Sequence, residues 1–193
     1  MMANAISSAI SKLATAEEST RVAGASEIYR RGRAPADRAI LPWWEDAELS
    51  ELLLNPEPIV TVGLAVRRET FARIRAANGK PARADVPSEQ DAEEFELHFA
   101  DGVELDVLTS REPNGQGAIA RFLARFGEGV QQVEFRCRNV DRAMGILRER
   151  FSVAPIYPKA RAGANGSKVN FVLVPVPGAA ENAKVLIELY ELP

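Results

Sequence analysis

The chain has 193 residues, of which 46% are hydrophobic and 26% are charged, and its formal net charge is −3. This composition is typical of a globular protein, and a weakly acidic chain offers no electrostatic basis for binding nucleic acid or an anionic membrane surface. No apolar run approaches the roughly 20 residues that span a bilayer, and the N-terminus lacks the pattern of a secretion signal. The only cysteine, Cys137, falls in the apolar phase of a strand, so the sequence predicts a buried thiol in a reducing cytoplasm.

The first 56 residues predict a helical N-terminal extension. Apolar residues recur at helical spacing from Ile6 to Leu13, and a second helix is expected before Pro35. Trp43 and Trp44 are adjacent, which favours an anchor that packs this extension onto the main body or onto a second subunit. The alternative is a lid over a ligand site.

After the extension, the chain repeats one order of elements: a strand, a helix and three strands. The first copy comprises a strand at 59–66, a helix at 69–78 and strands at 82–86, 94–99 and 103–108. The second copy comprises a strand at 132–138, a helix at 141–151 and strands at 156–157, 168–174 and 185–191. One copy alone cannot bury both faces of its sheet, so the two copies are expected to pack together.

The predicted fold class is therefore α+β, with two paired βαβββ modules that form a cupped eight-stranded mixed sheet, and with an N-terminal helical extension. The expected domains are the extension at 1–56, the first module with its connecting helix at 57–126, and the second module at 127–193. Because alternate residues of a strand face opposite sides, each half of the sheet should have an apolar face and a polar face.

The hairpin around Asp101–Gly102 carries the strongest turn signal in the sequence. With a two-residue turn, Phe99 lies opposite Glu104 and shares its face, while His98 points to the other face. We therefore expect His98, the only histidine, to be a core or surface residue and not a metal ligand. A three-residue turn would reverse this parity.

The polar face of the second module gathers ionisable and amide side chains. Gln132, Glu134 and Arg136 alternate with apolar residues and so share one face of their strand. Glu188 has a corresponding position on the last strand. Two strands that offer such groups from one face predict a lined cup for a small molecule. Arg136 is expected either to stabilise negative charge that develops on a substrate or to pair with a neighbouring glutamate.

Four short sequence segments occur in a characteristic order along the chain: Val103–Leu105, Gly127–Val133, Arg161–Phe171 and Leu186–Leu189. With them the chain resembles the vicinal oxygen chelate superfamily, which includes glyoxalase, bleomycin-resistance and dioxygenase proteins, and within it the methylmalonyl-CoA epimerases. The resemblance covers about residues 59 to 191. It implies paired βαβββ modules, a divalent metal held by the first and last strand of each module, a homodimer, and an isomerase, epimerase or lyase activity.

The resemblance assigns roles to individual residues. Glu104 and Glu188 match the metal ligands of the last strands, whereas the first-strand ligands, which are histidines in the superfamily, fall on Thr61 and Gln132. The catalytic base of the epimerases falls on Asp85. Replacement of both imidazoles removes the ligands that suit zinc or iron, and the remaining oxygen donors favour magnesium, manganese or calcium, or no metal at all.

The candidate residues fall into three sets. The catalytic set is Asp85, Glu104, Glu188 and Arg136; the metal set is Glu104, Gln132 and Glu188; and the substrate-binding set is Thr61, Gln132, Glu134, Asn170 and Lys168. Basic residues around Gly163–Gly166, among them Lys168, are suited to the phosphates of an acyl-CoA or form an ordinary solvated turn.

Two functions fit these residues. The first is an enzyme that removes a proton next to a carbonyl of a small molecule or acyl thioester, with a carboxylate as base. The second is a metal-free protein of the same fold that sequesters or carries a small molecule. The retained glutamates favour the enzyme, and the replacement of both histidines favours the binding protein.

Overall fold

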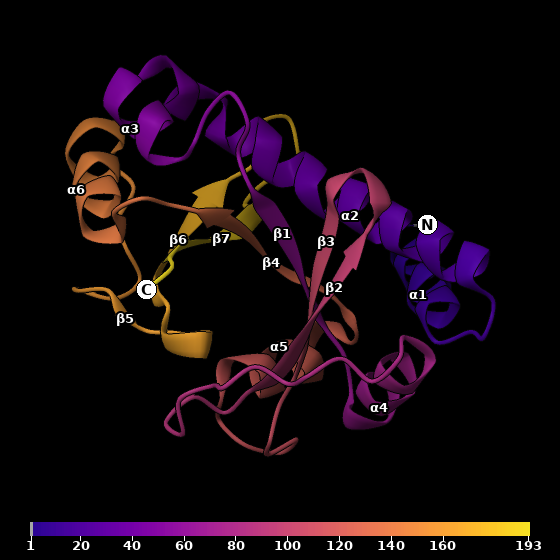
Figure 1. Ribbon diagram of the computed structural model, residues 1–193. Coiled ribbons are helices and arrows are strands. Elements are labelled where there is room, and N and C mark those ends of the chain that lie inside the picture. Colours follow the sequence, from indigo (N-terminus) through magenta and orange to yellow (C-terminus); the bar gives the residue numbers. More distant parts are fainter. Residues whose placement is uncertain (1) are drawn as a thin grey trace. The chain divides into compact units, whose positions relative to one another are not determined.

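The computed structural model describes residues 2–193, with side chains from Ala5 onward, and has an α+β fold (Figure 1). It divides into two compact units, each built from two stretches of chain: Met1–Gly32 with Thr61–Gln131, and Arg33–Val60 with Gln132–Pro193. The predicted fold class, including the helical N-terminal extension, is confirmed. No helix in the described part of the chain is long and apolar enough to cross a membrane.

The first unit has its apolar core on one face of three strands. Its elements are α1 (Met2–Leu13), α2 (Glu18–Ile40) up to Gly32, β1 (Val60–Ala65), α4 (Arg68–Ala77), β2 (Glu93–Phe99), β3 (Val103–Thr109) and α5 (Ala118–Phe126). The strand order is β2-β3-β1, with β1 parallel and β2 antiparallel to β3. Alternate residues of these strands, among them Phe95 and Leu105, pack in one cluster with Leu13 of α1, Ile28 of α2 and Phe71 of α4.

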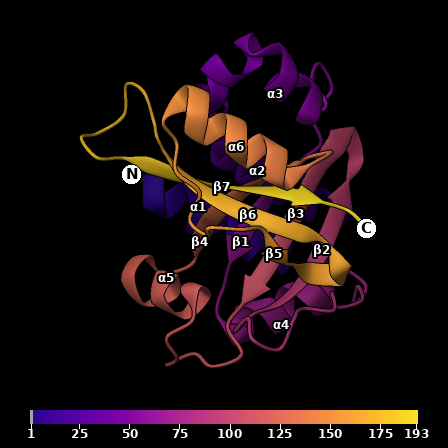
Figure 2. The ribbon, with the colours of Figure 1, turned by 90° about the vertical axis from the view of Figure 1, so that its left-hand side faces the viewer.

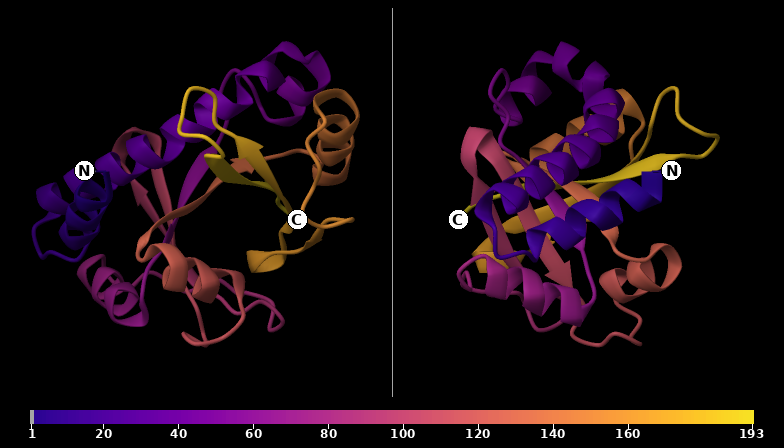
Figure 3. Two further views of the ribbon diagram at one scale, coloured as in Figure 1. Left: turned by 180° about the vertical axis from the view of Figure 1, so that it is seen from behind. Right: turned by 90° about the vertical axis from the view of Figure 1, so that its right-hand side faces the viewer.

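Close contacts at two glycines pack the N-terminal helices into the first unit. The right-hand view of Figure 3 shows the indigo α1 alongside the first half of α2. A Cβ atom on Gly24 would lie 2.8 Å from the carbonyl oxygen of Ala9, and one on Gly32 would lie 2.6 Å from a methyl carbon of Val62. A larger side chain at either glycine would force packed elements apart, because protein interiors have little spare volume. The helices of the extension are therefore part of the core.

The second unit is built around four strands. Its elements are α2 from Arg33 on, the 3-10 helix η1 (Leu41–Glu45), α3 (Ala47–Leu52), β4 (Gly129–Arg136) from Gln132 on, α6 (Val140–Phe151), β5 (Arg161–Ala162), β6 (Lys168–Pro175) and β7 (Lys184–Glu191). The order is β4-β7-β6-β5, with β4 parallel to β7 and the other pairs antiparallel. Helix α6 lies over β6 and β7 (Figure 2) and buries Ile146 and Leu147 completely.

Trp43 ties the N-terminal helical residues of this unit to its sheet. Its side chain is 2% exposed and belongs to one cluster with Ile40, Phe135 and Met144. Trp44 is half-buried, and its ring centroid lies 6.5 Å from that of Phe135. The predicted anchoring role of the adjacent indoles on the main body is thus confirmed within the second unit.

A network of ion pairs orients α3 on α6. Arg150 donates to Asp46 at 2.7 Å and to Glu48 at 2.9 Å, and Arg142 donates to Glu48 at 2.8 Å. The hydrogen bond from Arg142 lowers the pKa of Glu48. Because both arginines are exposed, these pairs fix geometry more than they add to the free energy of unfolding.

Two predicted strands are not formed among the described residues. Residues 82–86 are flanked by prolines and lack regular pairing, although Ala84 donates a backbone hydrogen bond to Glu94 at 3.0 Å. The strand expected at 156–157 is replaced by a bridge between Pro155 and Val172 and by the short β5. Seven strands are therefore present where eight were predicted, because proline cannot donate to a strand ladder.

The hairpin of β2 and β3 has a turn of three residues, Ala100 to Gly102, and not the two that were predicted. Asp101 and Gly102 take positive φ angles of 60° and 68°, and His98 pairs directly opposite Glu104. The prediction that His98 points away from the face of Glu104 was wrong. One extra residue in the turn reverses the prediction, because a shift of one residue in the pairing moves each side chain of a strand to the opposite face.

Replacing Trp43 tests the anchor. Trp43→Ala removes a packed indole, and such truncations cost about 3–5 kcal/mol, so the midpoint of urea unfolding should fall clearly. Leu41→Ala is the matched control, because Leu41 is 61% exposed and should change the free energy of unfolding by less than about 0.5 kcal/mol. Equal losses in both variants would contradict the place of Trp43 in the core.

Candidate functional site

A buried glutamine joins two carboxylates in the second unit. Gln132 on β4 is 7% exposed, and its amide nitrogen donates to Glu188 Oε2 at 2.6 Å and to Glu134 Oε1 at 3.0 Å. The parallel pairing of β4 with β7 sets Glu134 opposite Glu188, so the two carboxylates lie side by side on one face. The structure brings these three side chains together, as their strand phase predicted.

The amide group of Gln132 offsets only part of the negative charge that it contacts. Two neighbouring carboxylates repel each other, and a neutral amide donates hydrogen bonds without supplying a net positive charge. The position therefore suits a cation or the electropositive edge of a ligand. Two carboxylates and an amide form an all-oxygen ligand set, which fits magnesium, manganese or calcium better than zinc or iron. Among the described residues, no group of three or more His, Cys, Asp or Glu side chains is arranged to hold a metal, so such an ion would need Gln132 as a ligand.

A second polar group lies in the first unit. Thr61 of β1 is 7% exposed, and its hydroxyl donates to Glu104 Oε2 on β3 at 3.3 Å. His98 Nδ1 lies 3.8 Å from Glu104 Oε1, and His98 Nε2 lies 3.1 Å from Glu96 Oε2. The His98 side chain is 62% exposed, so it stands at the rim of this group.

Glu94 on β2 is an ionisable residue of this unit that the sequence did not single out. Its side chain is half-buried on the same face as Glu96, and it pairs with Leu108 of β3, which packs against Ile119 of α5. Burial raises the pKa of Glu94 to about 7, with a further increase from the charge of Glu96 and an opposing effect of Arg111. The Glu94 carboxyl group therefore retains its proton to a higher pH than an exposed glutamate does.

The sequence contains only a weak signal for this residue. Glu94 and Glu96 alternate with Phe95 and Leu97, and this pattern is typical of a strand with a solvated face. Glu96 is indeed 58% exposed. The difference between the two glutamates arises from apolar residues distant in sequence that pack around Leu108.

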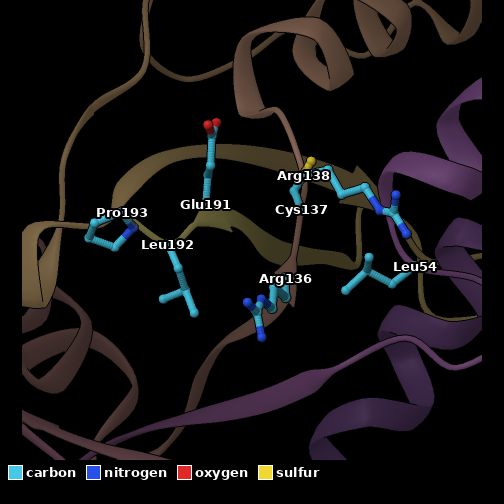
Figure 4. Close-up of a pocket in the computed structure, with 7 residues that line it drawn as sticks. All are labelled: Leu54, Arg136, Cys137, Arg138, Glu191, Leu192 and Pro193. Carbon is cyan, nitrogen blue, oxygen red and sulfur yellow. The ribbon is translucent and has the colours of Figure 1, made fainter.

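Arg136 lines a pocket of about 350 Å³ in the second unit (Figure 4). The pocket is formed by Leu54, Arg136, Cys137, Arg138, Glu191, Leu192 and Pro193. Glu191 is directed away from Arg136 in Figure 4, and its carboxylate accepts a hydrogen bond from Val140 N at 3.0 Å.

Cys137 is buried, as the sequence predicted. Burial raises the pKa of its thiol to about 11, so the thiol is protonated near neutral pH and is a poor nucleophile.

The remaining candidates lie apart from these groups or have structural partners. Asp85 is exposed in the irregular segment before β2. Asn170 is 1% exposed, and its side chain donates to Tyr157 O at 3.0 Å and accepts from Tyr157 N at 3.3 Å. Lys168 forms an ion pair with Asp141 at 2.7 Å. The structure thus uses Asn170 and Lys168 to hold the loop before β6.

Glu94 leads to a prediction about pH. Its ordinary pKa is 4.5 and its pKa in the fold is about 7, so between these values the folded state binds more protons than the unfolded state. The free energy of unfolding must then decrease as pH rises from about 4.5 to about 7, by on the order of 1 to 3 kcal/mol. Urea unfolding at pH 5 and pH 8 checks this, because Glu94→Gln should remove that part of the pH dependence. An unchanged difference between the two pH values in the variant would contradict the assignment.

Comparison with known proteins identifies solved structures that are similar to this chain. No known family profile matches the sequence, and no curated protein matches it. A methylmalonyl-CoA epimerase from Mycobacterium tuberculosis is similar in structure, with 27% sequence identity, a TM-score of 0.54, and coverage of 69% of this chain and 86% of that chain. A variant of the Streptomyces coelicolor methylmalonyl-CoA epimerase in complex with 2-nitronate-propionyl-CoA is 26% identical, with a TM-score of 0.53 and coverage of 69% and 96%.

A third similar structure is a methylmalonyl-CoA epimerase in complex with methylmalonyl-CoA and NH4+, at 27% identity, a TM-score of 0.53, and coverage of 69% of this chain and 93% of that chain. The matched portion leaves close to a third of this chain without a counterpart, which is consistent with a helical addition to a shared fold. The chain has the vicinal oxygen chelate fold that its sequence motifs predicted, and methylmalonyl-CoA epimerases are among its structural neighbours.

Proposed function

We propose that this protein is an isomerase, epimerase or lyase that moves a proton at the carbon next to a carbonyl, in a small molecule or an acyl thioester. The observation that carries the proposal is its structural likeness, over 69% of the chain, to epimerases, two of which are in complex with acyl-CoA ligands. The hydrogen-bonded set of Gln132, Glu134 and Glu188 supports it, because a carboxylate held on a rigid strand is a suitable base.

The second unit contains candidate groups for proton abstraction and for enolate stabilisation. A base must accept the proton from carbon, and a positive group must stabilise the enolate that forms. Glu188 is the proposed base on β7. Arg136 is the proposed enolate-stabilising group, because it stands two residues after Glu134 on the same face of β4 and lines a pocket. Its pocket is also open to a carboxylate or phosphate of the substrate.

The first unit carries two carboxylates to which the family resemblance assigns a role. Glu104, which accepts a hydrogen bond from Thr61, and Asp85, which takes the place of the epimerase base in the resemblance, are proposed as additional acid or base groups. Asp85 is exposed, so it requires a bound substrate to exclude water from it before it can act as an effective base.

The oxygen donors of Gln132 and Glu188 in the second unit suit a divalent cation, and the family resemblance assigns Glu104 of the first unit as a further ligand. Magnesium, manganese or calcium is proposed ahead of zinc or iron, because the donors of Gln132 and Glu188 are oxygens. Such an ion supplies Lewis-acid polarisation of the substrate carbonyl when it is bound.

A specific contact also favours the second candidate function, a metal-free protein that binds a small molecule. The amide nitrogen of Gln132 already donates to both carboxylates at 2.6 and 3.0 Å, so these groups are satisfied without a cation. In that case Arg136 and its pocket bind the ligand, and Glu188 and Glu134 orient it.

Proton exchange in heavy water tests the enzyme. Incubation with methylmalonyl-CoA and other acyl-CoA thioesters in deuterium oxide should place deuterium at the carbon next to the thioester, as measured by mass spectrometry. Glu188→Gln should lower the exchange rate by about 100-fold or more, because it removes a general base. The control is Glu181→Gln, since Glu181 is exposed in the loop before β7 and its replacement should leave the rate unchanged.

Two outcomes would count against this proposal in different ways. Exchange that is absent in the unaltered protein with every thioester would exclude the enzyme. If calorimetry still showed binding of a thioester, and Arg136→Met weakened that binding, the metal-free binding function would stand instead.

Thermal unfolding with added metal ions tests the cation. Magnesium, manganese or calcium should raise the unfolding temperature of the protein, because a ligand that binds only the folded state stabilises it. Zinc should raise it less, and Glu188→Gln should reduce the effect of all three hard ions. Equal unfolding temperatures with and without each ion would contradict the proposed cation and support the metal-free binding function.

A further inference from the structure

The pocket shown in Figure 4 belongs entirely to the second unit. Each of the seven residues that line it falls within Arg33–Val60 or Gln132–Pro193. Its volume of about 350 Å³ lies at the lower end of the range of small-molecule sites. Leu54, Leu192 and Pro193 give it an apolar wall, and its charged lining consists of two arginines and one glutamate. A ligand with an anionic group next to carbon atoms matches such a lining.

Backbone hydrogen bonds fix the segment that carries both arginines. The amide groups of Arg136 to Arg138 donate to the carbonyl oxygens of Ile59, Tyr190 and Leu52 at 3.0, 2.7 and 2.9 Å. Cys137, between the arginines, is 3% exposed, so the chain keeps the alternation of a strand past the end of β4. A rigid backbone therefore holds both arginines beside the pocket, as a binding site requires.

The acidic residues near this pocket are engaged elsewhere. The Glu191 carboxylate accepts a hydrogen bond from Val140 N at 3.0 Å, at the N-terminus of α6, and lies 4.0 Å from Lys168 Nζ. Glu51 approaches Arg138 only at 4.0 Å, and its side chain is 78% exposed, so this contact contributes little. The side chains that line the pocket thus carry two positive charges and one negative charge, and the negative charge is balanced by other groups.

The two arginines differ in their distance from the candidate base. Arg136 is two residues after Glu134, which stands opposite Glu188, whereas Arg138 is four residues after Glu134. Four residues of extended chain span about 13 Å. Figure 4 shows the guanidinium of Arg138 on the side of Leu54, apart from that of Arg136. Arg136 therefore suits the reacting end of a ligand, and Arg138 suits a group farther along it.

The basic residues of the loop before β6 are less suited to this second role. Lys168 is in an ion pair with Asp141 at 2.7 Å, and the guanidinium carbon of Arg161 lies 4.7 Å from the centroid of the Tyr157 ring. Both cations already have close partners in the fold, whereas the side chain of Arg138 is 61% exposed. An incoming anion meets less competition at Arg138.

We propose that this pocket binds an anionic group of the ligand, a carboxylate or a phosphate, that is remote from the reacting carbon, and that Arg138 recognises this group. A planar guanidinium donates paired hydrogen bonds to the oxygens of either anion, and Leu54 and Leu192 contact the adjoining carbon atoms. This inference rests on the proposed function and deepens it, because it names the class of ligand: an elongated thioester with a negative charge far from its reacting carbon.

Isothermal titration calorimetry with three thioesters tests this inference. Propionyl-pantetheine is neutral, glutaryl-pantetheine adds a carboxylate at the far end of the acyl chain, and propionyl-CoA adds phosphates at the other end of the molecule. The unaltered protein should bind one or both charged probes more tightly than the neutral probe. Arg138→Gln should weaken that binding by about 10-fold or more, because a hydrogen bond between charged groups is lost, and should leave the affinity for propionyl-pantetheine unchanged.

Two further variants make the test specific. Arg148→Gln removes the same charge from α6, at a side chain that is 63% exposed and does not line the pocket, so it should leave all three affinities unchanged. Arg138→Lys keeps the positive charge but loses the paired donors, so it should restore part of the affinity. Urea midpoints of all variants should match that of the unaltered protein, because both arginines are exposed.

The result for each charged probe identifies the anion. A loss in Arg138→Gln for glutaryl-pantetheine alone assigns the pocket to a carboxylate, a loss for propionyl-CoA alone assigns it to a phosphate, and a loss for both assigns it to either anion; each supports the inference. The inference is overturned if the unaltered protein binds the charged probes no more tightly than the neutral one. Equal losses for charged and neutral probes, or equal losses in Arg138→Gln and Arg148→Gln, also overturn it.

These binding measurements are independent of the proposed reaction. Binding that depends on Arg138, in a protein that exchanges no deuterium with any thioester, overturns the enzyme proposal and leaves the role of the pocket standing. Deuterium exchange in a protein whose affinities are the same with and without Arg138 overturns the role of the pocket and leaves the enzyme proposal standing.

Discussion

The parallel pairing of the first and last strand of each repeat is the constraint on which the polar groups depend. In the first unit, β1 pairs with β3, and Thr61 contacts Glu104. In the second unit, β4 pairs with β7, and Glu134 stands opposite Glu188. Parallel neighbours keep side chains of equal phase on one face, so carboxylates separated by more than 50 positions in sequence become adjacent. A shift of one residue in either pairing would send these groups into the apolar core.

The acidic side chains of the two units have different surroundings. Gln132 supplies hydrogen bonds to both Glu134 and Glu188, so those carboxylates remain satisfied despite low exposure. For Glu94 in the first unit, burial instead favours the neutral form. Strands of one fold can therefore hold carboxyl groups of different proton affinity, which is the property that acid–base chemistry requires.

The helical extension contributes to this arrangement through packing. Leu13 and Ile28 belong to the core beneath β1 to β3, and Trp43 belongs to the core beneath β4 to β7. A rigid backing of this kind keeps strand side chains within the narrow tolerance that a site needs. The extension is thus best understood as structural support for each unit, although it has no counterpart in the sequence motifs that carry the family resemblance.

The sequence alone determined the α+β class, the repeated order of elements and the shared face of Gln132 and Glu134, because hydrophobic alternation is a local property of the chain. It also predicted the burial of Cys137 and the anchoring by Trp43. The tertiary structure decided the rest: the three-residue turn that placed His98 opposite Glu104, the missing strand at 82–86, the pocket beside Arg136 and the partial burial of Glu94. Each of these depends on residues distant in sequence or on a single turn residue, and a local pattern carries no information about either.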